Sequence, residues 1–182
     1  MIKANELKQV YIVISQTGTV LSRILKLITG AEYNHASISL ADDLSVMYSF
    51  GRRNPYNPFW GGFVCESAST GLFKRFPKTE VIVLEMALDA QKHQKISKAI
   101  DDMKLNKKKL KYNYFGLILA FFKKEHRFKN KFYCSEFVKY ILRDFDVLSG
   151  EDLSGVLQPI HFLKLPLNEV YKGTLIEYTN QF

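Results

Sequence analysis

The first half of the chain has apolar and polar positions arranged as in β-strands. Residues 10–14 form a continuous apolar run, which is typical of a buried strand. Residues 34–40 alternate apolar side chains with serines and predict a half-buried strand that begins near His35. A turn follows, and residues 46–50 return as the second strand of a hairpin. Counting back across the turn places His35 opposite Ser49 and Phe50, within about one residue of register.

Further strands and one long loop follow from the same reasoning. Proline and glycine signals predict a loop over residues 51–62. Its aromatic residues suggest a packed or ligand-facing flap. Short strands are predicted over 63–66 and 80–86, and a last strand over 174–178.

Apolar residues at intervals of three and four predict four helices. They span residues 19–28, 89–104, 114–122 and 134–145. Asp89 is placed to cap the second helix. The third is apolar on all sides and short, which predicts either a buried core helix or one that dips into a membrane. Strands and helices together indicate a single α+β domain over residues 1–182.

Composition narrows the classes of function. The chain has 182 residues, 47% of them hydrophobic, and this is typical of a globular protein. Its two cysteines, Cys65 and Cys134, are too far apart for a disulfide framework, and no metal-ligand spacing is present, so we expect no cofactor and no metal. No signal peptide or membrane-length run is recognised, which predicts a cytoplasmic protein.

The net charge of +8 favours a polyanionic partner, although solvated lysine faces give the same charge. The apolar residues 114–122 are followed at once by a cluster of cations: Lys123, Lys124, Arg127, Lys129 and Lys131. An apolar segment bordered by cations suits peripheral contact with an anionic membrane. The alternative is a core helix followed by a solvated loop. Nucleic acid is not expected as a partner, because no recognisable binding motif is present.

Cys134 is the first candidate for chemistry. It lies at the start of a predicted helix, where unpaired backbone N–H groups and the helix dipole lower a thiol pKa and are available to an oxyanion. A small buried core residue is the alternative. A nucleophilic cysteine needs a base, and four histidines are present. His93 and His126 look solvent-facing, whereas His35 opens a strand and His161 follows the cysteine in the sequence.

Three segments resemble a known family. They are Asn34-His35-Ala36-Ser37-Ile38, Tyr112-Asn113-Tyr114-Phe115-Gly116-Leu117 and Phe132-Tyr133-Cys134-Ser135-Glu136-Phe137-Val138. Together they resemble the circularly permuted NlpC-type papain-like cysteine hydrolases, with the YiiX-like branch closest, in which the histidine precedes the cysteine. The resemblance implies a papain-like antiparallel sheet or partial barrel packed against helices. It also implies Cys134 as nucleophile and His35 as base.

The activity implied is that of a cysteine hydrolase or acyltransferase on an amide or ester, through a thioester intermediate. An amidase, a peptidase and a lipid acyl hydrolase all fit that description. A non-catalytic binding domain of the same fold, docking on anionic lipid or nucleic acid, is the alternative. The residue that orients His35 does not carry over from the resemblance: Glu66 and Ser49 are the candidates, both placed on neighbouring strands. Gln16 or Tyr11 would assist at the oxyanion.

Overall fold

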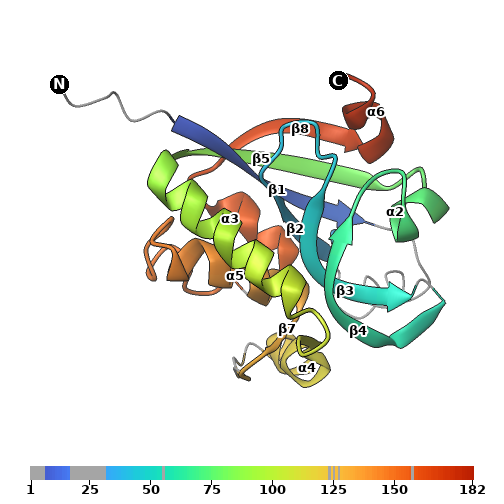
Figure 1. Ribbon diagram of the computed structural model, residues 1–182, viewed down its shortest axis with the longest axis vertical. Helices are drawn as coiled ribbons and strands as arrows, with labels where there is room; N and C mark the ends of the chain where they lie inside the picture. The colour runs from blue at the N-terminus through green and yellow to red at the C-terminus, as the bar shows by residue number, and fades with distance from the viewer. Residues whose placement is uncertain are drawn as a thin grey trace.

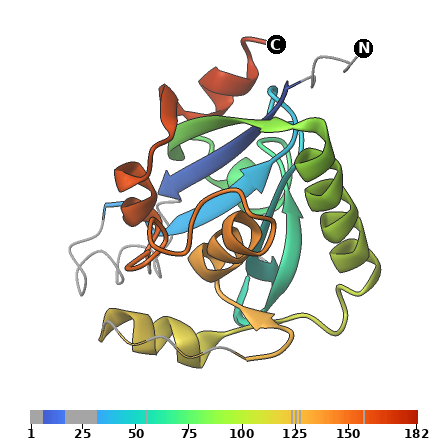
Figure 2. The same cartoon turned by 90° about the vertical axis from the view of Figure 1, so that its left-hand side faces the viewer.

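The computed structural model describes residues 7–16, 32–54, 56–122, 128–156 and 158–182, together with Lys124 and His126. The predicted helix over residues 19–28 lies outside these residues. The described chain has an α+β fold, in which helices cover both faces of one eight-stranded mixed sheet (Figures 1 and 2).

The strand order in the sheet is β7-β6-β4-β3-β2-β1-β5-β8. The strands are β1 (Leu7–Gln16), β2 (His35–Ser39), β3 (Met47–Asn54), β4 (Asn57–Glu66), β5 (Glu80–Asp89), β6 (Lys111–Tyr112), β7 (Lys131–Phe132) and β8 (Asn168–Thr174). Neighbouring strands are antiparallel except for β6 and β7, which are parallel. The predicted antiparallel sheet is therefore correct for the central strands and wrong at this edge.

The described chain also contains five α-helices and one 3-10 helix. They are α2 (Gly71–Arg75), α3 (Ala90–Leu105), α4 (Tyr114–Phe121), α5 (Cys134–Asp144), the 3-10 helix η1 (Pro159–Lys164) and α6 (Leu175–Thr179). Asp89 caps α3 as predicted, because its Oδ1 accepts a hydrogen bond from the Lys92 N–H at 2.9 Å. None of the described helices is long and apolar enough to cross a membrane.

Each face of the sheet has its own hydrophobic core. Alternate residues of β1 point to opposite faces, so Ile12 and Ile14 belong to one core and Tyr11 and Val13 to the other. The first core packs under α3 and α5 and includes the fully buried helix residues Ile96, Ile100, Phe137, Val138, Ile141 and Leu142. The second packs under α2 and α6 through Phe73, Leu175 and Tyr178. As a result, β2 runs through the centre of the molecule with a helix layer on each side.

The predicted loop over residues 51–62 is wrong. β3 continues to Asn54 and β4 begins at Asn57, so most of this segment is hairpin strand. Gly62, which indicates a turn in the sequence, instead pairs with Gly51 within the sheet. At Gly61 an added Cβ would lie 2.7 Å from the Tyr112 Cβ, so the missing side chain lets β6 approach β4.

The last predicted strand is also wrong. Residues 168–174 form β8, and residues 175–179 form the short helix α6. The Thr174 hydroxyl accepts a hydrogen bond from the Glu177 N–H at 3.3 Å, and the Glu177 carboxylate accepts one from the Thr174 N–H at 3.4 Å. This reciprocal capping starts a helix in a segment whose composition favours a strand.

Helix α4 forms where predicted, but it is not a buried core helix. Ala120 is 2% exposed, whereas Phe115 and Ile118 are 56% and 53% exposed. One side of α4 therefore packs against the protein, and the other presents large apolar side chains to the surroundings. Its position at the β6–β7 edge of the sheet is visible at the bottom of Figure 1.

Candidate functional site

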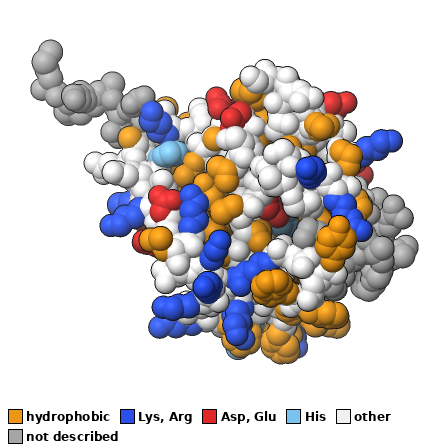
Figure 3. All heavy atoms as spheres, turned by 45° about the vertical axis from the view of Figure 1, so that its right-hand side comes forward, with side chains coloured by type: hydrophobic (Ala, Val, Ile, Leu, Met, Phe, Trp, Pro, Cys, Tyr) orange, Lys and Arg blue, Asp and Glu red, His pale blue; other side chains and the backbone are white. Residues whose placement is uncertain are grey.

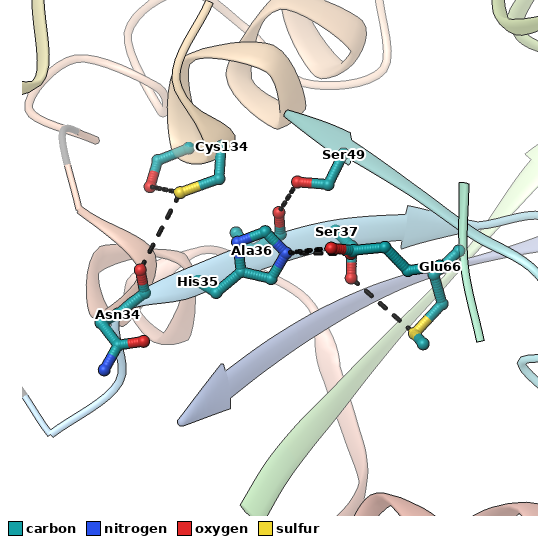
Figure 4. A network of polar contacts seen from close by, with 9 residues as sticks. Asn34, His35, Ala36, Ser37, Ser49, Glu66 and Cys134 are labelled. Atoms are coloured by element: carbon teal, nitrogen blue, oxygen red, sulfur yellow. Dashed lines mark hydrogen bonds and ion pairs between the residues drawn. The ribbon is translucent and has the colours of Figure 1, made fainter. Parts of the chain in front are cut away.

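Cys134 is the first residue of α5 and is 3% exposed. The helix starts beside the beginning of β2, and the Cys134 Sγ lies 4.0 Å from the Asn34 carbonyl oxygen and 4.0 Å from the Ser135 Oγ (Figure 4). The first N–H groups of a helix have no partner within the helix. A carbonyl bonded to this sulfur would therefore have backbone donors nearby.

A side-chain brace sets the position of this helix start. The Glu136 Oε2 accepts hydrogen bonds from the Tyr133 N–H at 3.2 Å and from the Asn113 Nδ2 at 3.0 Å. The Asn113 Oδ1 in turn accepts the Gly116 N–H at 2.9 Å and caps α4. An added Cβ at Gly116 would lie 2.2 Å from the Asn113 Nδ2, so this cap needs the glycine. The starts of α4 and α5 are thus fixed to each other.

His35 lies between Cys134 and Glu66. Its Nε2 is 2.9 Å from the Glu66 Oε2 and 3.1 Å from Oε1, and both side chains are 13% exposed. The opposite ring nitrogen, Nδ1, faces Cys134 (Figure 4), and the imidazole and the thiol are close enough for each to shift the pKa of the other. The predicted contact between Glu66 and the imidazole nitrogen that faces away from Cys134 is confirmed.

Gly51 leaves the space through which Glu66 reaches His35. Glu66 is at the end of β4, His35 is at the start of β2, and β3 runs between them. An added Cβ at Gly51 would lie 3.4 Å from the Glu66 Oε1 and 3.6 Å from the His35 Cε1. The carboxylate and the imidazole therefore meet across a residue that has no side chain.

The charges of this site favour an ion pair. Burial opposes a charged imidazole, but the Glu66 carboxylate and the hydrogen bonds to Cys134 and Glu66 raise the pKa of His35 to about 10. Burial also opposes a thiolate, but the hydrogen bond and positive charge of His35 lower the pKa of Cys134 below its ordinary value. Both shifts act in the same direction, because each favours a thiolate next to an imidazolium.

Ser49 is not the partner of His35. Its buried hydroxyl donates to the Ala36 carbonyl oxygen at 2.6 Å (Figure 4). Of the two candidates for the third residue, the structure brings Glu66 to the imidazole and uses Ser49 to join β3 to β2. The physical reason is reach: Ser49 lies directly beside the β2 backbone, and a hydroxyl on one carbon satisfies the nearest acceptor.

Neither candidate for the oxyanion donor contacts the sulfur among the described interactions. Tyr11 belongs to the second core, where burial and the nearby Glu85 and Asp42 raise the pKa of its phenol. Gln16 ends β1 opposite Glu80.

Tyr112 is the phenol that lies close enough to Cys134 to interact with it. Burial, followed by the charge of Cys134, raises the pKa of Tyr112 well above its ordinary value. The phenol therefore stays protonated and keeps a hydrogen to donate near the thiol. Tyr112 begins one of the three segments that resemble the known family, but the sequence indicates no role for it. Its contact depends on β6, a strand of two residues that pairs with β4 and β7.

The other histidines have different surroundings. The His161 Nδ1 accepts the Gln158 N–H at 3.4 Å at the start of η1. The His126 ring packs against Phe115 and Phe128. His93 lies on α3, where partial burial and the charge of Lys8 lower its pKa. In the described ranges, no group of three or more His, Cys, Asp or Glu residues is arranged to hold a metal ion.

Comparison with known proteins gives no match. No family model fits the chain, and neither the curated proteins nor the solved structures contain a significant match to it. The functional argument therefore depends on the geometry of the site.

Proposed function

We propose that this protein is a cysteine hydrolase or acyltransferase that acts on an amide or ester bond through a thioester. The observation that carries the proposal is the buried chain Cys134–His35–Glu66, with the thiol at a helix start and its pKa lowered by the imidazolium. A nucleophile, a base and a residue that orients the base are what nucleophilic acyl transfer requires.

In the first half of the proposed reaction, the Cys134 thiolate attacks the carbonyl carbon and forms the C–S bond. The negative charge that develops on the carbonyl oxygen is stabilised by backbone N–H groups in the first turn of α5 and by the nearby Tyr112 phenol. His35 then gives its Nδ1 proton to the leaving amine or alcohol as the bond to the carbonyl carbon breaks. The products of this half are the free amine or alcohol and a thioester on Cys134.

In the second half, neutral His35 takes a proton from water or from another acceptor as its oxygen or nitrogen attacks the thioester. The C–S bond breaks and the electron pair returns to Cys134, which restores the thiolate and the imidazolium. Glu66 holds the imidazole by its Nε2 throughout and stabilises its positive form. Water as acceptor gives hydrolysis, and an alcohol or amine gives transfer.

The arrangement of elements supports a permuted papain-like fold as part of the proposal. The cysteine starts a helix that packs on the sheet, and the histidine opens a central strand earlier in the chain. These are the positions that the resemblance of the three sequence segments implies.

The test is profiling with electrophilic amide and ester probes in the wild type, Cys134→Ala and Cys65→Ala. We expect labelling of the wild type and of Cys65→Ala, and none of Cys134→Ala. If the fold has kept only a binding role, the probes will label Cys134 no faster than an ordinary thiol. Equal labelling of both cysteines in the folded protein contradicts the catalytic proposal.

We further propose that the site works at an anionic membrane surface. Helix α4 and the adjoining residue Phe122 present Phe115, Ile118 and Phe122, and the β3–β4 hairpin presents Tyr56, Phe59 and Trp60. Lys124, Lys129 and Lys131 are exposed next to α4, whereas Lys123 and Arg127 lie outside the described residues. Each cation near such a surface adds about 1 kcal/mol to binding. Figure 3 shows hydrophobic and basic side chains gathered over the lower part of one face.

Vesicle co-sedimentation tests the membrane proposal. We expect binding to anionic vesicles at low salt, weaker binding at high salt, and a loss in Phe115→Ser with Ile118→Ser. Lys123→Glu with Lys124→Glu is expected to weaken it as well. Ile176→Ser is the control, because it removes an exposed apolar residue from α6 at the opposite end of the molecule. Equal binding to neutral and anionic vesicles contradicts the proposal.

A further inference from the structure

The proposed base lies on the second-core face of the sheet, whereas the proposed nucleophile begins a helix of the first core. His35 pairs with Ser15 across β1 and β2, and directly paired residues point to the same face of a sheet. Ser15 shares its face with Val13, a residue of the second core. Glu66 pairs with Met47, which also belongs to that core. The imidazole and its carboxylate partner therefore lie on the side of the sheet that α2 and α6 cover.

Phe73 of α2 is the neighbour of the imidazole on this face. The centroids of the Phe73 and His35 rings are 6.4 Å apart, and the ring planes are tilted by 53°. Phe73 is 2% exposed and is the buried residue of α2, whereas Lys74 and Arg75 of the same helix are exposed. The buried side of this short helix is therefore the side that neighbours the base.

Hydrogen bonds before and after α2 set the position of its buried ring. On the N-terminal side, the Ser67 Oγ lies 2.8 Å from the Thr70 Oγ1, and the Thr70 N–H donates to the Ser67 carbonyl oxygen at 3.3 Å. On the C-terminal side, the Thr79 Oγ1 donates to the Phe76 carbonyl oxygen at 2.6 Å. The helix lies beside β4, the strand that supplies the carboxylate (Figure 1). Phe73 is thus fixed to the same part of the chain as the partner of the imidazole.

We propose that Phe73 is a positioning residue, whose ring holds the imidazole of His35 against Glu66 and keeps water away from this ion pair. The inference rests on the proposed function, because the base matters for the reaction only if Cys134 is acylated. An ion pair that is shielded from water has a stronger electrostatic attraction than one in contact with water.

The balance of effects at His35 gives the direction of the change when water enters. Burial lowers the pKa of His35, yet the Glu66 carboxylate and the contact with Cys134 raise it from an ordinary value of 6.5 to about 10. The attraction therefore outweighs burial in the closed site. Water beside the pair would weaken both effects, so the pKa would return toward its ordinary value, which is a decrease.

The charged and titratable neighbours of the imidazole are few in the described part of the chain. Glu66 faces it from β4 and Cys134 from α5. The other sides carry no charge, since they are formed by Phe73 of α2, the fully buried Ser15 of β1 and Gly51 of β3. A change in the pKa of the imidazole after substitution of Phe73 therefore reports on the carboxylate, the thiol and access of water.

A pH titration of His35 followed by proton NMR tests the proposal without using the thiol. The imidazole Cε1–H is observed in Cys134→Ala, alone and combined with Phe73→Ala, Phe73→Val or Phe73→Leu. We expect Phe73→Ala and Phe73→Val to lower the pKa of His35 by roughly one unit or more, and Phe73→Leu to lower it less, because leucine keeps most of the apolar cover.

Leu44→Ala is the matched control for this titration. Leu44 is a fully buried residue of the second core and lies in the turn between β2 and β3, at the opposite end of β2 from His35. Its removal disturbs the same core without opening the space beside the imidazole, so the pKa of His35 should stay as it is. An unchanged pKa in the Phe73 variants, or an equal decrease in Leu44→Ala, overturns the proposal.

The salt dependence of the same pKa keeps the test independent of how well a Phe73 variant folds. Salt screens exposed charge pairs much more than buried ones. With Phe73 in place, we expect the pKa of His35 to change little between low and high salt, and in Phe73→Val we expect it to fall as salt is added. A pKa that already falls with salt when Phe73 is present overturns the exclusion of water.

Labelling of Cys134 by an amide probe separates this proposal from the proposed function. His35 must be protonated to release the amine, so the labelling rate should fall as the pH rises through the pKa of His35. We expect this fall at lower pH in Phe73→Val than in the wild type or Leu44→Ala. Equal profiles in the three proteins overturn the role of Phe73 and leave the function. Absence of labelling in the wild type overturns the function, and the NMR titration still decides whether Phe73 shields the ion pair.

Discussion

The two cysteines of this protein show that access to solvent and thiolate character are separate properties. Cys65 is exposed on β4, yet partial burial and the charge of Glu66 raise its pKa, against the lowering effect of Lys104 and Lys107. Cys134 is buried, which by itself opposes a thiolate, yet its pKa is lowered by His35. The position of a charge therefore decides the outcome more than the exposure of the sulfur does.

Glu66 has opposite effects on these two thiols. It is the next residue after Cys65, and successive side chains of a strand point to opposite faces of the sheet. Its carboxylate raises the pKa of Cys65 directly, whereas at His35 it stabilises the imidazolium that lowers the pKa of Cys134. The following predictions test this contrast, from the largest expected effect to the smallest.

Replacing the two cysteines in turn should give the largest difference. We expect Cys134→Ala to abolish turnover of any amide or ester substrate found by profiling, and Cys65→Ala to leave turnover within about twofold of the wild type. In the wild type at pH 7, iodoacetamide should alkylate Cys134 roughly tenfold faster than Cys65 or more. Peptide mapping by mass spectrometry measures both rates. Faster alkylation of Cys65 would reverse the comparison.

Removing the imidazole should make Cys134 resemble a buried thiol without a partner. We expect His35→Ala to lower turnover by about 10²–10⁴-fold, the usual contribution of a general acid–base group. Alkylation of Cys134 should also slow at neutral pH, because burial alone raises a thiol pKa. His161→Ala is the matched control and should keep both rates. If His161→Ala removes turnover while His35→Ala is harmless, the histidine assignment is wrong.

Replacing Glu66 should change the pH dependence of Cys134 alkylation while the fold stays intact. The pKa of His35 is about 10, so in the wild type the imidazolium persists from neutral pH up to that value. In Glu66→Gln burial lowers the pKa of His35, and the loss of imidazolium raises that of Cys134. We therefore expect a profile of alkylation against pH that is level through neutrality in the wild type and shifted to higher pH in Glu66→Gln, with turnover reduced on the order of 10²-fold.

Ser49→Ala distinguishes a structural role from an orienting one. Its hydroxyl bonds the Ala36 carbonyl oxygen, so we expect a loss of about 1 kcal/mol in the free energy of unfolding and an unchanged pH profile. Denaturant unfolding and the alkylation profile measure the two effects. A shifted profile in Ser49→Ala with a normal one in Glu66→Gln would restore Ser49 as the orienting residue.

Tyr112→Phe should lower turnover less than the loss of Cys134, His35 or Glu66 does. It removes one of several donors near the sulfur while it keeps the ring that packs on Tyr114. We expect turnover to fall roughly tenfold, with little change in the rate of iodoacetamide alkylation, because the donor matters most when charge develops on the carbonyl oxygen. The matched control is Tyr11→Phe. Equal losses in both variants contradict a role for Tyr112 at the site.

The parts of the site that sequence predicts are those with a local signature. Cys134 is recognisable from the helix that it begins, and His35 from the alternating strand that it opens. Glu66 is one of two candidates from the sequence. Assigning a residue to a strand predicts its place in the sheet, but it does not predict how far its side chain reaches. Tyr112 had no predicted role, because β6 is too short for a pattern and exists only through its pairing with β4 and β7.

The errors in the predicted fold have similar causes. Residues 51–62 contain prolines and glycines that indicate a loop when each is considered alone. In the structure, Gly51 and Gly62 pair with each other within the sheet, and Gly61 accommodates β6. Residues 174–178 contain apolar and aromatic side chains typical of a strand, but reciprocal capping by Thr174 and Glu177 starts a helix. Partners distant in sequence decide the first case and backbone capping decides the second.

The empty position at Gly51 makes the site sensitive to a residue that takes no part in the chemistry. Alanine fits there, since its Cβ would meet its neighbours at 3.4 to 3.6 Å. A valine or leucine would wedge the carboxylate away from the imidazole while every polar side chain of the site remained in place. Such a variant would fold with its thiol, base and acid intact and still lose their coupling. A survey of essential positions that considers polar residues alone would therefore miss Gly51, where a small side chain is needed for the carboxylate to reach the imidazole.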